Sequence, residues 1–149
     1  MPLFLRLYPK KREVWDAETI FLALDVCDDA RLKLAINLSF ACSMRIGEIL
    51  GLTWDCVDIS PQSIAVGTAS IRIEKELQRV DKTAMKSLEQ KDVLFIFPQS
   101  SKRNTSMFVL KKPKTESSVR KVFIPATVAH QLESWKREQE RTKEALGGE

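Results

Sequence analysis

Apolar residues follow one another most densely between Leu32 and Met44, and this stretch predicts a buried helix. Its only polar positions are Lys33, Asn37, Ser39 and Ser43. A helix that is apolar around most of its circumference needs protein on most of its sides. Arg45 follows at once and precedes a short predicted helix over 46–50, so a guanidinium is placed at the end of the most apolar segment of the chain.

Two longer helices are predicted, one on each side of this segment. Asp16 suits an N-cap for a helix that ends near Cys27. Its inward positions are expected to be Ile20, Phe21 and Leu24. Pro125 can open a final helix. The buried stripe of that helix, at i, i+4 and i+7, consists of Val128, Leu132 and Trp135. Beyond position 135 the chain is mostly charged, so that end is expected to be exposed.

Alternating apolar positions predict three β-strands. The first covers 70–80, and the other two, 107–111 and 119–124, are expected to form a hairpin with a polar tip. Residues 81–90 predict a short helix, while 93–97 fit a strand or a buried loop. The predicted fold class is therefore α+β, mainly helical with a small three-stranded antiparallel sheet. Residues 1–14 are expected to form a linker or arm.

Composition narrows the class of protein. With 149 residues, 44% of them hydrophobic, the chain can fold as one domain. No apolar run reaches the roughly 18 residues that span a bilayer, and no signal peptide is recognised, so a cytoplasmic protein without membrane contact is expected. The cysteines lie in or beside apolar segments without metal-ligand spacing, and the chain has one histidine. We therefore expect reduced core thiols, no metal site and no cofactor.

The net charge of +4 is concentrated in one short segment. Between Lys111 and Lys121 five basic residues accompany one acidic residue, so the remainder of the chain sums to zero. Such a concentration of positive charge suits a polyanion, although a solvated charged loop would have the same composition.

Arg45 and Glu48 allow two interpretations. Spaced i, i+3, they can form a salt bridge on a helix surface, which would be structural. Alternatively, the guanidinium binds a phosphate that arrives with a substrate, because its planar fork matches phosphate oxygens. Spacing by itself leaves both interpretations open.

The residues around Arg45 resemble the first-arginine motif of the tyrosine-type site-specific recombinases, the phage integrase family. That motif reads roughly T-G-x-R-x-G-E-x-x-x-L-x-W-x-D-[IV]-D, and residues 42–58 read CSMRIGEILGLTWDCVD. The arginine, glycine, glutamate, leucine, tryptophan and final aspartate coincide at unbroken spacing. Ser43 and Cys56 depart from the pattern, at positions where the family usually has Gly and Asp or Glu.

A second segment, PKTESSVRKVFIP over 113–125, resembles the family's mobile β-hairpin, commonly K-T-x-x-S-x-R-x-[IV]-P-[LI]. The resemblance implies that Lys114 is the family's catalytic lysine. The expected catalytic residues are thus Arg45 and Lys114, with Glu48 orienting Arg45. The expected contacts to DNA are Lys111, Lys112, Ser117, Ser118, Arg120 and Lys121.

The resemblance covers residues 15–149 and corresponds to the first half of the family's catalytic domain. In that family a tyrosine attacks a DNA phosphodiester without a metal, forms a 3′-phosphotyrosyl link and releases a 5′-hydroxyl. The family's His-x-x-Arg motif and nucleophilic tyrosine lie further C-terminal and have no match here. Tyr8 precedes all the matched residues, and His130 has no arginine three positions later.

The implied function is that of a fragment of a recombinase or integrase from a mobile element. The full-length parent would act on double-stranded DNA as a multimer, whereas the fragment by itself is expected to bind DNA weakly and not to cleave it. One alternative is a truncated, non-catalytic DNA-binding remnant or regulator. Another is a protein-interaction module whose arginine is fully paired inside the protein.

Overall fold

The computed structural model describes residues 13–87, 92–99, 101 and 104–147. Most of the predicted arm over 1–14 lies outside these residues. The elements are α1 (Ala17–Val26), α2 (Ala30–Cys42), α3 (Ile46–Leu50), η1 (Trp54–Cys56), β1 (Val57–Asp58), α4 (Pro61–Ala65), β2 (Ser70–Ile73), β3 (Glu76–Asp81), α5 (Lys82–Ser87), β4 (Val93–Ile96), β5 (Ser106–Lys111), η2 (Glu116–Ser118), β6 (Arg120–Phe123) and α6 (Ala126–Ala145).

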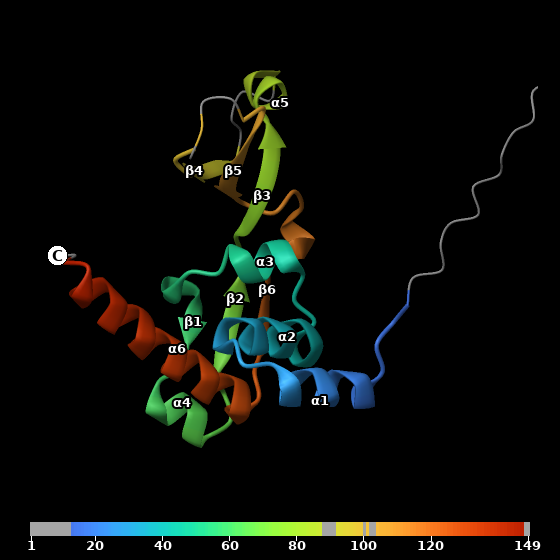
Figure 1. Cartoon of the computed structure of the whole chain (residues 1–149), viewed down its shortest axis with the longest axis vertical. Coiled ribbons are helices and arrows are strands. Elements are labelled where there is room, and N and C mark those ends of the chain that lie inside the picture. The colour runs from blue at the N-terminus through green and yellow to red at the C-terminus, as the bar shows by residue number, and fades with distance from the viewer. Residues whose placement is uncertain (1–12, 88–91, 100, 102–103, 148–149) are drawn as a thin grey trace, which may run out of the picture.

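The strands form two antiparallel sheets of three strands each. Sheet A has the order β1-β2-β6, and sheet B has the order β3-β5-β4. Sheet A lies among the helices, and sheet B projects beyond α3 (Figure 1). The predicted α+β class is confirmed, with two small sheets in place of the expected one.

The predicted strand over 70–80 is divided between the two sheets. Glu74 and Lys75 separate β2, which belongs to sheet A, from β3, which belongs to sheet B. The sequence carries a trace of this break, because Lys75 interrupts the alternation of Ile71, Ile73 and Leu77, and Val80 is out of phase with it.

The predicted hairpin over 107–124 is wrong. β5 pairs with β3 and β4, whereas β6 pairs with β2, so residues 112–119 cross from sheet B to sheet A. Pro113 lacks the N–H that would continue the ladder of β5. Val122 lies opposite the buried Ile71 in sheet A, so burial in the core fixes the position of β6.

The core lies between sheet A, α2 and α6. Its buried members are Leu34, Leu38, Cys42, Met44, Ala69, Ile71, Ile73, Ile124, Val128, Ala129 and Leu132. The predicted stripe of α6 is confirmed, since Trp135 packs beside Val128 and Leu132. The expectation that α2 is buried on most sides is wrong, because Leu32 and Phe40 are about half exposed. Helices α6, α3 and α1 pack against α2, and among the described residues they leave the part of its surface at Leu32 and Phe40 open.

Caps set the ends of the first helices. Asp16 accepts a hydrogen bond from the N–H of Thr19, and Asp29 accepts from the N–H of Arg31, so each aspartate caps its helix as N-cap residues do. Ile20 is buried as predicted, but Phe21 is exposed. Among the described residues, no helix combines the length and the apolar composition needed to cross a bilayer.

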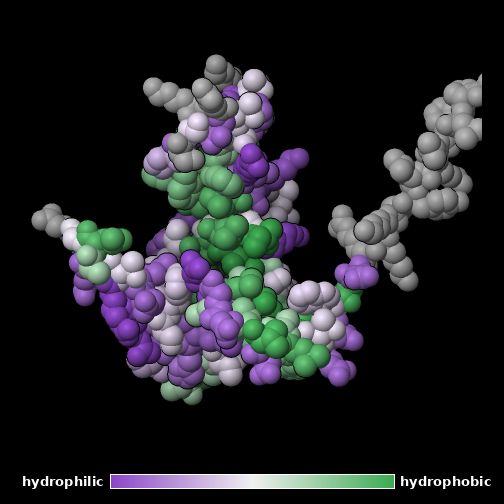
Figure 2. Space-filling view, in the orientation of Figure 1, coloured by the Kyte–Doolittle hydropathy of each residue, from purple (hydrophilic) through white to green (hydrophobic). Residues whose placement is uncertain are grey.

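Apolar side chains remain uncovered on sheet B in the described part of the chain. Leu94, Phe95, Ile96, Phe97 and Phe108 are all exposed. From the sequence, residues 93–97 fitted either a strand or a buried loop. Residues 93–96 form the edge strand β4, and Phe97 follows it directly. A continuous apolar surface extends from sheet B toward α2 and α1 in the space-filling view (Figure 2).

Candidate active site

The carboxylate of Glu48 is the centre of the site around Arg45. Its side chain is 4% exposed and lies in the first turn of α3. Oε2 accepts a hydrogen bond of 2.9 Å from the backbone N–H of Arg45. This is the contact that the third helical residue makes with the N-cap residue in a capping box. Oε1 accepts from Nη1 of Arg45 at 3.2 Å. The i, i+3 ion pair that the sequence allowed is therefore present.

A second guanidinium makes the stronger contact with the same carboxylate. Arg120 of β6 donates from Nη1 to Oε1 of Glu48 and from Nη2 to Oε2, both at 2.9 Å. This is the bidentate geometry in which arginine binds carboxylates best. Because this contact is the main cause, the pKa of Glu48 lies below its ordinary value and the pKa of Arg120 lies above its own.

The charges of Arg45, Glu48 and Arg120 therefore do not balance. One carboxylate is shared by two guanidinium groups, which leaves a net charge of +1. The Arg45 side chain is 75% exposed, whereas that of Arg120 is 32% exposed. The surplus positive charge thus faces solvent at Arg45 and is available to an anion.

Backbone geometry positions Arg45 at the surface of the core. Ser43 ends α2 in the left-handed conformation, with φ of 52°, and its N–H bonds back to Leu38. This turn directs the chain into α3, which packs on the backbone of β3. A Cβ on Gly51 would lie 2.6 Å from the nitrogen of Leu77, so only glycine permits this approach.

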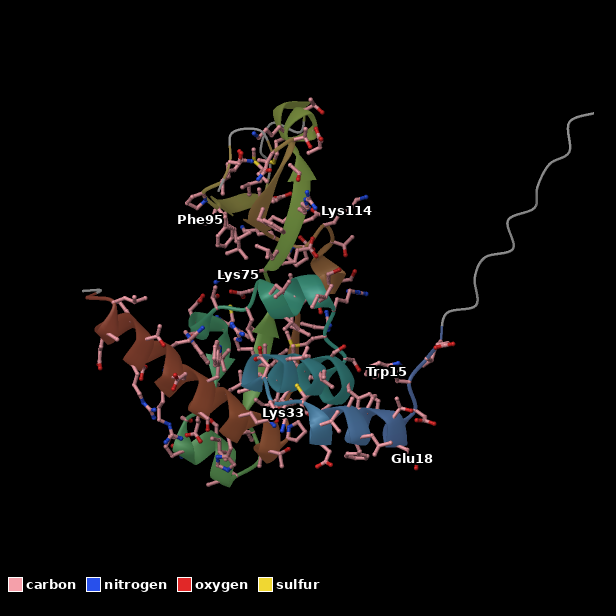
Figure 3. The ribbon with its side chains drawn as sticks, viewed as in Figure 1. Trp15, Glu18, Lys33, Lys75, Phe95 and Lys114 are labelled. Carbon is pink, nitrogen blue, oxygen red and sulfur yellow. The ribbon has the colours of Figure 1, made fainter. Side chains whose placement is uncertain are left out.

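Lys114 lies in the connection from sheet B to sheet A. Its side chain is exposed and projects from that connection, on the other side of the molecule from Phe95 in Figure 3. The turn after it is internally bonded, since the hydroxyl of Thr115 lies 3.0 Å from that of Ser117 and 2.9 Å from that of Ser118. The carbonyl of Ser118 accepts a hydrogen bond of 3.4 Å from Nη1 of Arg120. The Lys114 segment and the Arg45 turn are thus attached to the same guanidinium.

The remaining predicted DNA contacts are distributed over different surfaces. Lys112 is exposed beside Lys114, whereas Lys111 is largely buried and lies 3.9 Å from Glu76. Arg120 pairs in register with the buried Ile73, and Lys121 pairs with the exposed Arg72. Consecutive strand residues point to opposite faces, so Arg120 and Lys121 cannot contact one surface together.

The bidentate contact of Arg120 with Glu48 is the feature that the sequence interpretation missed. A phosphate contact by Arg120 stays a prediction, and a phosphate would have to compete with Glu48 for the same guanidinium. The alternation along β6 could have predicted that Arg120 points inward. Arg120 lies two and four residues before Val122 and Ile124, which face the core, so all three share one face of the strand.

Lys75 was also missed. It lies at the boundary between the two sheets (Figure 3) and donates from Nζ to Asp55 Oδ2 at 2.6 Å and to Thr53 at 2.7 Å. Ligand atoms of Asp55, Cys56 and Glu74 lie within 4.8 Å of one another, the one such group among the described residues. The Lys75 ammonium already supplies a cation to this group. Burial also raises the pKa of the Cys56 thiol, which disfavours the thiolate that a metal would bind.

His130 does not join the site. Its Nδ1 lies 2.9 Å from a carboxylate oxygen of Glu133 on the exposed side of α6. This contact is local to α6 and involves none of the residues around Arg45.

Comparison with known proteins agrees with the motifs. A model described as the phage integrase family matches residues 13–143. The match covers most of the chain, so this chain belongs to the phage integrase family. Searches of the curated proteins and of the solved structures return no match. Membership supports a role in site-specific DNA recombination or integration, in a family of enzymes that break and rejoin DNA.

Proposed function

We propose that this chain supplies the first arginine and the lysine of a site-specific DNA recombinase, with Arg45 and Lys114 as catalytic residues. The observation that carries the proposal is the surplus charge at Arg45. Arg120 already binds the buried carboxylate in bidentate fashion, so the outer guanidinium keeps one 3.2 Å contact and most of its exposure. In the alternative of a protein-interaction module, this arginine would instead be fully paired inside the protein.

The two cations have distinct roles in the proposed reaction. Arg45 holds the non-bridging oxygens of the scissile phosphate and stabilises the charge that grows on them in the transition state. The oxygen of a tyrosine of the full-length parent, as phenolate after its proton has passed to solvent, forms the new bond to phosphorus while the bond to the 5′-oxygen breaks. Lys114 gives its proton to that departing oxygen as a general acid, which leaves a 3′-phosphotyrosyl link and a free 5′-hydroxyl.

Glu48 supports Arg45, and exposed polar residues would hold the duplex. Lys112 and Ser117, close to Lys114 in the chain, and Lys121, on the outer face of sheet A, are the candidates with exposed side chains. Contacts of this kind to phosphates add affinity without sequence information. The parent is proposed to work as a multimer on double-stranded DNA, and the chain by itself is proposed to bind DNA without cleaving it.

Binding to a nonspecific duplex, measured by fluorescence anisotropy over a series of salt concentrations, tests the proposal. Arg45→Ala and Lys114→Ala should each weaken binding and lower the slope of log K against log salt by about 1. Lys33→Ala is the matched control, because Lys33 lies on α2 at a distance from Lys114 (Figure 3). If neither substitution changes affinity or slope, the proposal fails.

A second measurement tests the missing nucleophile. Incubation of this chain with duplex DNA, followed by denaturing electrophoresis, should give no covalent protein–DNA adduct. An adduct would contradict the proposal that the tyrosine is supplied from outside these residues.

A further inference from the structure

We propose that Arg120 is a positioning residue, which keeps Arg45 free for phosphate and holds the Lys114 turn beside it. The inference rests on the proposed function and assigns Arg120 a role other than the phosphate contact expected from the sequence.

A single guanidinium connects two segments that are distant in the sequence, residues 43–48 and its own segment over 118–120. Besides both oxygens of Glu48, Arg120 Nη2 donates to the backbone carbonyl of Ser43 at 3.3 Å. Arg120 Nη1 also donates to the carbonyl of Ser118 at 3.4 Å. Ser43 lies two residues before Arg45, and Ser118 lies four residues after Lys114. Arg120 thus joins the turn that carries one proposed catalytic cation to the turn that carries the other.

Competition for Glu48 explains how Arg120 keeps Arg45 free. A carboxylate that is 4% exposed requires a positive partner, because an unpaired buried charge is costly. Arg120 satisfies it with two short hydrogen bonds. Without Arg120, the guanidinium of Arg45, already 3.2 Å away, becomes the remaining cation in contact with that carboxylate. Arg45 would then be drawn inward and its charge neutralised.

The position of Arg120 in sheet A directs its side chain inward. It pairs with Ile73, which is buried, so both side chains lie on the core face of the sheet. A lysine here would place one compact ammonium where the structure uses a planar fork with several donors. Arg120→Lys should therefore retain the charge but lose part of the positioning.

Salt-dependent DNA binding in a double-mutant cycle tests the inference. Arg120→Met removes the charge and keeps an apolar stem. We expect Arg120→Met to lower the salt slope by about 1, as Arg45→Ala does, and Arg45→Ala to cause no further loss in the Arg120→Met background. Neutralising Glu48 as well, with Glu48→Gln in the Arg120→Met background, should free Arg45 and restore its contribution. Arg72→Met, on the outer face of the same sheet, is the matched control and should leave the effect of Arg45→Ala unchanged.

Other outcomes overturn the inference. If Arg120 itself binds phosphate, the two losses will multiply and the double variant will lose about 2 from the slope. If Arg120 only stabilises the fold, Arg45→Ala will have the same effect in both backgrounds when each variant is measured well below its melting temperature. Should Arg120→Met not fold, Arg120→Lys takes its place in the cycle, where a smaller but measurable coupling is required. If Arg45→Ala has no effect on DNA binding in the unmodified chain, the proposed function is refuted instead.

Discussion

Lys75 Nζ lies 2.6 Å from Asp55 Oδ2, and this ion pair attaches the connection between the two sheets to η1. The lysine is largely buried, whereas the aspartate is mostly exposed. Mainly through this hydrogen bond, and secondarily through Thr53, the pKa of Asp55 is held well below its usual range. The contact lies where β2 ends and β3 begins, so it helps fix where sheet B leaves the core.

Lys75→Met should therefore raise the pKa of Asp55 toward its ordinary value of 3.8, because the main hydrogen bond to the carboxylate is lost. Titration of the carboxyl carbon by NMR measures the shift. Arg72→Met is the control, since Arg72 donates to the backbone carbonyl of Asp55 and not to its side chain. An unchanged pKa in Lys75→Met would show that the ion pair does not persist in solution.

Glu48→Gln should change how stability depends on pH. The pKa of Glu48 is lower in the folded protein than its ordinary value of 4.5, so its contribution is present above that pH and is lost as pH falls through the folded-state pKa. The substitution should cost about 3 kcal/mol at neutral pH, because two guanidinium groups lose their carboxylate, and should make the acid decline shallower.

Urea unfolding across the acid range measures this effect. Glu138→Gln is the control, because the Glu138 carboxylate lies at the surface of α6, 3.5 Å from Arg141. Parallel curves for the Glu48→Gln variant and the unmodified chain would argue against a charged Glu48 in the folded state.

Ser43→Gly should stabilise the protein by about 0.5–1 kcal/mol, because Ser43 has a positive φ that a Cβ disfavours. The phage integrase motif usually has glycine at this position. Ser39→Gly provides the matched comparison, since Ser39 is an exposed position within α2. There the same change should destabilise by about 0.5 kcal/mol. Opposite signs in thermal or urea unfolding would support the left-handed turn, and equal signs would contradict it.

Gly51→Ala should destabilise the protein by about 1–3 kcal/mol, because its Cβ would meet the backbone of β3 at 2.6 Å and no side chain can move aside. Gly47→Ala is the comparison with a milder clash, because a Cβ on Gly47 would lie 3.0 Å from the carbonyl oxygen of Leu77. Its smaller clash is offset in part by the better helix propensity of alanine. Equal effects of the two substitutions on urea unfolding would mean that α3 does not pack against β3 this closely.

Local signals in the sequence predicted the helices well. The N-cap at Asp16, the short helix after Arg45 and the apolar stripe of α6 are all present. Such features depend on residues within a few positions of one another, so their spacing is sufficient to predict them. The motif around Arg45 predicted the family for the same reason, since its residues are consecutive, and the family match confirms it.

Local spacing did not predict which strands pair. Alternation predicted strands near 107–111 and 119–124, but it could not tell that they belong to different sheets. A strand pairs with whichever partner buries its apolar face best, and that partner can be distant in the chain. Val122 has its partner in Ile71, 51 residues earlier, so the expected hairpin gave way to a crossing between sheets.

The amino-acid sequence by itself predicted which residues would carry the chemistry, because Arg45, Glu48 and Lys114 stand in recognisable local patterns. Only the tertiary structure decided how charge is shared among them. Arg120 reaches Glu48 across 72 residues of chain, and nothing in local spacing specifies that a strand of sheet A delivers the second guanidinium. The balance of two cations against one buried anion arises from packing, and that balance leaves Arg45 exposed.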